Sequence, residues 1–117
     1  MTDTHGRDAP ALRSMVPSIV DEIVARVHPV RVILFGSVAR GEERADSDLD
    51  LLVVLDQVDP AVRAHLMGQI RLAITAPASI DILVTDVDEF EGRKNVNGSI
   101  FYWPAREGEV VYERDAA

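Results

Sequence analysis

The stretch FGSVARGEERADSDLDLLVVLD, residues 35–56, decides the fold, because it links an apolar segment through Gly-Ser and a charged loop to two aspartates and a second apolar segment. Residues 30–35 (VRVILF) and 49–55 (LDLLVVL) are short apolar runs rich in β-branched side chains. Such runs are typical of strands that are covered on both faces. The stretch therefore predicts two strands of one sheet, joined by a helical turn at 38–40 and a charged loop at 41–47.

Helices and further strands are predicted on both sides of this stretch. Apolar residues recur on one helical face from Ser14 to about residue 28, with Ser14 as N-cap and Pro17 in the first turn. Asp59-Pro60 predicts the start of a helix that runs to about residue 74. The remaining predicted elements are a strand at 79–84, a helix at 86–91, a turn at 95–98, a helix at 99–107 closed by Gly108, and a strand at 110–112. This order predicts an α/β (α+β) fold with a small mixed sheet of three to four strands flanked by helices.

Length and composition predict one domain. A chain of 117 residues buries roughly two-thirds of the surface that its unfolded form exposes, and it is too short for separate catalytic and substrate domains. Residues 1–10 are polar and lack periodicity, so we expect a disordered tail there and a single domain over 11–117. The sequence has no cysteine, no signal-peptide pattern and no apolar run of membrane-spanning length. We therefore expect a cytoplasmic protein that does not act at a membrane.

The charge of the chain argues against direct nucleic-acid binding. The formal net charge is −8, from 20 acidic and 12 basic residues, and Lys94 is the only lysine. Nucleic-acid binders draw much of their affinity from many Lys and Arg contacts with phosphates. Phosphate recognition by this chain would instead depend on arginine, backbone amides or a metal ion.

Three aspartates are candidate metal ligands. Asp48 and Asp50 stand two residues apart, so on a strand their side chains point to the same side, separated by about 6.6 Å of strand rise. Asp81 is the one charged residue in the predicted strand 79–84, and it joins the pair if that strand lies beside 49–55. Three such carboxylates repel one another unless a cation is present. Oxygen ligands of this kind favour a hard divalent ion, Mg²⁺ above all, held together with substrate phosphates.

The Gly-Ser element is a candidate phosphate site. Gly36 lacks a Cβ and lets a ligand approach the backbone, while Ser37 adds a hydroxyl donor at a helix start, where an anion is favoured. Arg40 and Arg44 follow in the loop and are within reach of a triphosphate. Gly-Ser or Asp-x-Asp alone is more often a turn. Their combination with the third aspartate favours a site for a nucleoside triphosphate and its metal.

These residues resemble the signature of the nucleotidyltransferase superfamily that includes DNA polymerase beta, and within it the minimal nucleotidyltransferases. That signature is Gly-Ser, ten residues, then Asp-x-Asp, followed by a third carboxylate on a strand. The chain matches it with Gly36-Ser37, VARGEERADS and Asp48-Leu49-Asp50, and Asp81 fits the third position. The resemblance also covers the Ala-Arg-Gly after Gly-Ser, Ser47 and the segment EGEVVYE at 107–113, and so spans most of the chain from about residue 14.

The resemblance implies transfer of AMP from ATP to an acceptor hydroxyl, with release of pyrophosphate. It implies two Mg²⁺ ions and a set of residues that serves both as metal ligands and in catalysis: Asp48, Asp50 and Asp81. Of these, Asp81 would also accept the hydroxyl proton. The nucleotide-binding residues that it implies are Gly36, Ser37, Arg40 and Ser47.

Larger relatives carry additional domains for an antibiotic, RNA or DNA acceptor, and a chain of 117 residues has no room for one. The acceptor is therefore expected to be small or to belong to another protein. Chains of this size resemble the antitoxins of toxin–antitoxin pairs whose other member is a helical HEPN-domain ribonuclease. The resemblance implies that AMP is added to a tyrosine hydroxyl of that toxin. Two alternatives stay open: an antitoxin that neutralises its partner by binding alone, and a transferase for small molecules of the aminoglycoside type.

Aromatic and histidine side chains are weaker candidates. Tyr102 and Trp103 are predicted mainly as packing residues, although either could stack on a nucleobase or contact a partner. His5, His28 and His65 have no second His or Cys at ligand spacing, so no metal role is predicted for them.

Overall fold

The fold is built on one mixed four-stranded sheet. We describe residues 12–44 and 46–115 of a computed structural model, so the predicted tail at 1–10 lies outside the described residues. The strands are β1 (Arg31–Phe35), β2 (Leu49–Leu55), β3 (Ile80–Asp86) and β4 (Glu109–Glu113), in the order β3-β2-β1-β4. β1 is antiparallel to β2 and to β4, whereas β2 and β3 are parallel. The predicted fold class is confirmed.

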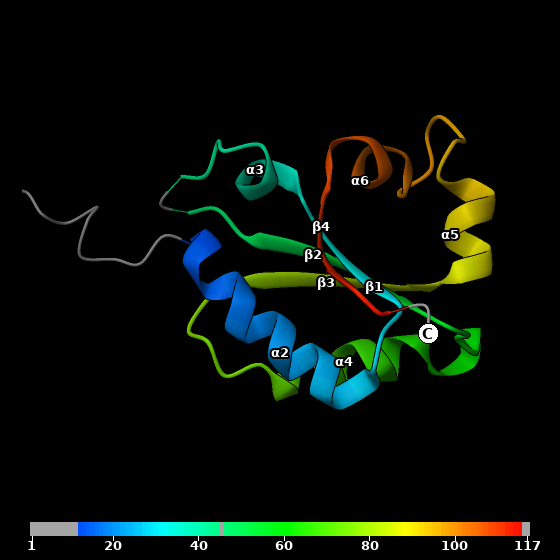
Figure 1. Ribbon diagram of the computed structural model, residues 1–117, viewed down its shortest axis with the longest axis horizontal. Coiled ribbons are helices and arrows are strands. Elements are labelled where there is room, and N and C mark those ends of the chain that lie inside the picture. Colours follow the sequence, from blue (N-terminus) through cyan, green and yellow to red (C-terminus); the bar gives the residue numbers. More distant parts are fainter. Residues whose placement is uncertain (1–11, 45, 116–117) are drawn as a thin grey trace, which may run out of the picture.

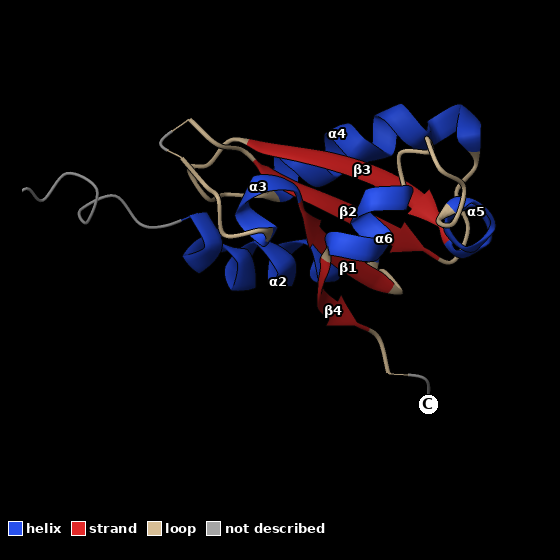
Figure 2. Cartoon of the chain, turned by 90° about the horizontal axis from the view of Figure 1, so that it is seen from above, coloured by secondary structure: helices blue, strands red, loops and turns tan. Residues whose placement is uncertain are grey.

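Helices cover the sheet from two sides (Figure 1). The helices α2 (Val16–Val27) and α4 (Arg63–Ala73) lie on one face, and α3 (Gly36–Ala39), α5 (Val87–Arg93) and α6 (Tyr102–Glu107) lie on the other. Figure 2 shows α3 and α6 over this second face. Two 3₁₀ turns, η1 (Leu12–Met15) and η2 (Pro60–Val62), lead into α2 and α4. Within the described residues, no helix is long and apolar enough to cross a membrane.

The two faces of the sheet carry apolar clusters of different size. Alternate residues of the central strands, such as Leu34, Leu51 and Val53, pack with buried side chains of α2 and α4 in the main core. The residues between them form a smaller cluster with α5 and with the residue just before α6. This cluster consists of Ile33, Leu52, Val54, Phe90 and Phe101. Its two phenylalanine rings meet edge to face, with centroids 6.0 Å apart. The second face is therefore only partly covered by apolar packing.

The helix ends are where structure and prediction differ. The prediction of Ser14 as N-cap is wrong, because Ser14 lies within η1 and the N-cap of α2 is Met15, which makes no side-chain capping bond. Asp59 does cap the next segment by accepting from the Ala61 amide at 2.9 Å, but that segment begins as the 3₁₀ turn η2. Gly108 follows α6 with φ −75°, so it is not a left-handed cap. A Cβ there would collide with the Pro104 carbonyl and with the Ile33 side chain, so close packing of α6 on β1 accounts for the glycine.

Candidate active site

The three predicted metal ligands come together at one end of the sheet. Asp50 in β2 is the register partner of Phe35 in β1 and of Asp81 in β3. Asp48 lies two residues before Asp50, just ahead of β2. Asp50 and Asp81 have the same strand alternation as Leu52 and the other residues of the smaller cluster, so they belong to the second face. The third strand thus lies beside the second, as the carboxylate cluster requires.

Burial and the neighbouring charges act on Asp50. Burial raises the pKa of the Asp50 carboxyl above its ordinary value, and the negative charges of Asp81 and then Asp48 raise it further. The positive charge of Arg40 acts in the opposite direction and lowers that pKa. The ionised form of Asp50 is therefore disfavoured by its surroundings, and added positive charge nearby would relieve this cost.

The Gly36 turn is shaped around Asp50. Gly36 begins α3 with φ +79°, a conformation that L side chains rarely adopt. A Cβ built on Gly36 would collide with the carboxylate oxygen Oδ2 of Asp50. The absence of a side chain therefore lets the Gly36-Ser37 backbone lie directly against this carboxylate.

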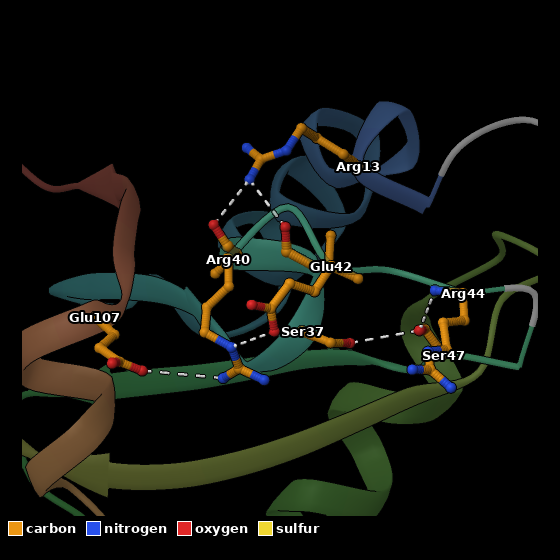
Figure 3. Close-up of polar contacts among 9 residues, drawn as sticks. Arg13, Ser37, Arg40, Glu42, Arg44, Ser47 and Glu107 are labelled. Atoms are coloured by element: carbon orange, nitrogen blue, oxygen red, sulfur yellow. Dashed lines mark hydrogen bonds and ion pairs between the residues drawn. The ribbon is translucent and has the colours of Figure 1, made fainter.

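Hydrogen bonds link the two halves of the sequence motif (Figure 3). The Ser47 hydroxyl accepts from the Arg44 amide at 2.6 Å and lies 3.4 Å from the Ser37 hydroxyl. The amide of Glu42 donates to the Ser37 carbonyl at 2.8 Å. These bonds hold the loop after α3 so that Ser37 and Ser47, ten residues apart, face one another.

Arg13 supports the α3 turn, although the sequence does not predict it as a site residue. Its Nη2 donates to the carbonyls of Val38 and Ala39 at 3.1 and 3.5 Å (Figure 3). Its Nη1 pairs with Glu109 at 2.8 Å. One guanidinium therefore connects η1, the end of α3 and the start of β4. No motif or periodicity in the sequence marks this arginine, because its partners are two backbone carbonyls and a distant carboxylate.

Comparison with protein families shows which family the chain belongs to. The family described as nucleotidyltransferase domain matches residues 16–103, a range that includes the Gly-Ser turn and all three aspartates. The chain belongs to this family. No curated protein sequence matches the chain.

Solved structures resemble the nucleotidyltransferase domain in fold. One is a presumed nucleotidyltransferase from Sulfolobus solfataricus, with 22% sequence identity, a TM-score of 0.61, and coverage of 86% of this chain and 79% of that chain. Another is a toxin–antitoxin structure with AMP-PNP, with 17% identity, a TM-score of 0.54, and coverage of 84% and 73% of the two chains. At these identities the likeness concerns the fold.

The aspartates of the nucleotidyltransferase domain fit a divalent cation by chemistry and by placement. They supply the oxygen donors that Mg²⁺ prefers, from neighbouring strands, and a cation would offset the repulsion among them. The side chains are not preassembled, however: among the described residues, no group of three or more His, Cys, Asp or Glu side chains is arranged to hold a metal ion. Binding would therefore require the carboxylates to turn toward a common point.

The predicted phosphate ligand Arg40 stands between two glutamates. Its Nε donates to Glu42 at 2.9 Å, and its Nη1 lies 3.9 Å from Glu107 of α6 (Figure 3). Both ion pairs are solvent-exposed, so each contributes little stability and is readily exchanged for another partner. Arg40 is thus placed near Asp50 without being tied to it.

Three consecutive aromatic residues at the start of the α6 region, Phe101, Tyr102 and Trp103, have different surroundings. Phe101, just before the helix, is buried in the smaller cluster. The Arg106 guanidinium lies over the Tyr102 ring, 3.7 Å from its centroid. Trp103 is 58% exposed and lines an open cavity of about 360 Å³ together with Arg40 and Glu107. The predicted packing role therefore suits Tyr102 better than Trp103.

Proposed function

We propose that this nucleotidyltransferase domain transfers AMP from ATP to a hydroxyl group, and that the acceptor is a tyrosine of a partner HEPN-domain toxin. The observation that carries the proposal is the pairing of Asp50 with Asp81 across β2 and β3, with Asp48 two residues away and the Gly36 turn against Asp50. Carboxylates beside a glycine turn, where a ligand can approach the backbone closely, suit a triphosphate and its metal. In this proposal the chain acts as the antitoxin.

The reaction is an in-line displacement at the α-phosphorus of ATP. The acceptor oxygen forms a bond to this phosphorus while the bond from phosphorus to the bridging oxygen of pyrophosphate breaks. The hydroxyl proton passes to the carboxylate of Asp81, which is exposed and so open to an incoming acceptor. Bound Mg²⁺ would neutralise the phosphate charge that develops in the transition state.

The remaining site residues would bind and position the triphosphate. Asp48 and Asp50 would hold the metal, while the Gly36-Ser37 turn and the Ser47 hydroxyl would donate hydrogen bonds to phosphate oxygens. Arg40 would leave its two exposed glutamate partners to bind a phosphate, since a bidentate contact with an anion is stronger than either exposed pair.

The partner is proposed from the fold likeness and the charge. A protein with this fold occurs in a toxin–antitoxin structure with AMP-PNP, which agrees with a nucleotide and a toxin as ligands. The net charge of −8 would complement the basic RNA-binding face of a ribonuclease.

The experiment is intact-mass spectrometry of the protein encoded beside this one, after incubation with the chain, Mg²⁺ and ATP. We expect a mass gain of one or more adenylyl groups, at a rate lowered about a thousandfold or more in Asp48→Asn/Asp50→Asn, because loss of metal ligands removes several kcal/mol of transition-state stabilisation. Asp88→Asn, an exposed aspartate on α5, is the matched control and keeps the wild-type rate. No gain with any variant would contradict transfer to this partner.

Neutralisation by binding alone is the second candidate, because a protein with this fold occurs in a toxin–antitoxin structure. In that case Asp48→Asn would protect cells from the toxin as well as the wild type does, and the two proteins would form a stable complex without any mass gain. Protection that is lost with Asp48→Asn while the complex persists would favour catalysis instead.

A further inference from the structure

The cavity beside α6 is lined by none of the three aspartates. It has a volume of about 360 Å³ and is lined by Arg40, Trp103 and Glu107. Its size falls within the range of small-molecule sites, roughly 300–1,000 Å³. α6 contacts α3, the short helix that begins with the Gly36-Ser37 turn. A ligand whose phosphates lie at that turn would therefore have its other end near this cavity.

Trp103 presents an aromatic surface that the core does not use. Its side chain is 58% exposed, whereas the neighbouring Phe101 is 1% exposed. The Tyr102 ring contacts the indole in T-shaped geometry, with centroids 5.1 Å apart, and so helps to hold its orientation. An exposed and oriented indole is a platform on which any nucleobase can stack.

Arg40 and Glu107 give the cavity a polar edge. Arg40 lines the cavity and is also close enough to Asp50 for its charge to act on that carboxyl, so it bridges the aspartate site and the cavity. Among the residues that the structure describes, the Glu107 carboxylate pairs only with Arg40, at 3.9 Å, so it can still accept hydrogen bonds from a ligand. A carboxylate favours a base edge that carries an amine and disfavours one that presents carbonyl oxygens.

We propose that the cavity lined by Arg40, Trp103 and Glu107 binds the base of the nucleoside triphosphate, with Trp103 stacking on the base and Glu107 accepting from its exocyclic amine. This inference rests on the proposed nucleotidyltransferase function and adds its base specificity. Stacking is tolerant of base identity, so discrimination comes from Glu107. Adenine carries an exocyclic amine on its six-membered ring, whereas uracil carries a carbonyl oxygen at the corresponding position, so adenine is preferred.

Trp103 is the only tryptophan, so its fluorescence reports on this cavity directly. The protein is titrated in Mg²⁺ with ATP, UTP and inorganic triphosphate, and calorimetry measures binding in parallel. We expect ATP to change the emission, UTP to do so only at higher concentration, and inorganic triphosphate to bind without changing it. None of these measurements depends on turnover or on a partner.

Variants separate stacking from amine recognition. Trp103→Ala weakens ATP binding about tenfold and leaves inorganic triphosphate binding unchanged. Trp103→Phe retains much of the affinity because an aromatic ring remains. Ile100→Ala removes an apolar side chain of matched exposure, 60%, that does not line the cavity, and it leaves ATP binding unchanged. Glu107→Gln lowers the preference for ATP over UTP by about threefold or more, because the amide also donates to a carbonyl.

The outcomes distinguish this inference from the function on which it rests. One outcome is that calorimetry shows ATP binding, while ATP leaves the Trp103 emission unchanged and Trp103→Ala binds ATP as tightly as the wild type does. In that case the base site is wrong and the proposed function stands. If ATP does not bind at all, both are wrong. Emission that responds to the partner protein but not to ATP would make the cavity part of a protein interface, and would overturn the base site.

Discussion

The two faces of the sheet differ in what covers them. Toward α2 and α4, the central strands present a continuous apolar surface to buried helix residues such as Ile19, Ile23 and Ile70. Toward α5 and α6, the smaller cluster covers only part of the face, and the starts of β2 and β3 bear aspartates instead. One face therefore provides most of the hydrophobic stabilisation. The other gives up part of that burial to hold charged groups within reach of solvent.

This difference explains how a small domain supports a charged site. Carboxylates on neighbouring strands destabilise their own surroundings, as the raised pKa of Asp50 shows. The strands that carry them are nevertheless fixed by the apolar side chains on their opposite face, because side chains alternate along a strand. Under the proposed function, stability and catalysis are divided between alternate residues of β2 and β3, and substitutions on the two faces should have separable effects.

The largest expected effect on stability is a cavity in the α2/α4 face. Ile70→Ala removes a side chain that is 0% exposed and should lower the free energy of unfolding by about 2–5 kcal/mol. Leu72→Ala, on the same helix but 86% exposed, should change it by less than about 0.5 kcal/mol. Urea unfolding followed by circular dichroism measures both. Equal losses would mean that the exposed side of α4 is buried in solution, for instance against another chain.

The second prediction separates backbone strain from contact with the aspartate. Gly36 and Gly41 have similar left-handed φ values, +79° and +73°, but only at Gly36 would a Cβ meet another group, the Asp50 carboxylate. We expect Gly36→Ala and Gly41→Ala each to lower the free energy of unfolding by about 1–2 kcal/mol because of the strained φ. Gly36→Ala should also lower the transfer rate by about a hundredfold, since it displaces Asp50.

Gly41→Ala is the matched control in this experiment, because a Cβ there meets nothing within 4 Å. Stability and the transfer rate are measured on the same preparations. If both variants lose transfer equally, the backbone conformation of the loop matters for activity, and the contact between Gly36 and Asp50 does not.

The sequence predicts the parts of the molecule that depend on local pattern. The bounds predicted for β2 agree with the structure because its apolar run is bracketed by turn-forming residues. The placement of Asp81 beside Asp50 follows from one condition, that β3 lies next to β2. The Gly-Ser turn is marked in the sequence because a glycine is required against the carboxylate.

Features made by residues distant in sequence escape such prediction. Arg13 reaches carbonyls of α3 that are 25 and 26 residues away, and no local pattern signals this. The cavity at Trp103 depends on how α6 packs beside α3, which fixes its distance from Arg40 and Glu107. In sequence Gly108 resembles a helix cap, yet a glycine is required there because the chain passes close to β1. Packing between elements decides each of these cases, and pattern within an element does not.

The smallest expected effect on stability tests whether the aspartates on the second face of the sheet destabilise the fold. The pKa of Asp50 is raised in the folded state, first by burial and then by Asp81 and Asp48, so the folded state binds a proton more tightly than the unfolded state does. Ionised Asp50 therefore destabilises the fold above its folded pKa, and this cost disappears as the pH falls below the ordinary value of 3.8. Asp50→Asn should raise the free energy of unfolding at pH 7, and with it Tm, by less than about 1 kcal/mol in free energy because the carboxylate is partly solvated.

The advantage of Asp50→Asn should shrink as the pH is lowered from 7 toward 4, because protonation removes the charge from wild-type Asp50. Thermal unfolding of both proteins across this range measures it. Added Mg²⁺ should raise the Tm of the wild type and leave that of Asp50→Asn nearly unchanged, since a ligand that binds only the folded state stabilises it. If Asp50→Asn is less stable than the wild type at pH 7 without metal, then Asp50 stabilises the sheet. The conclusion that the second face gives up stability to carry charged groups would then be wrong.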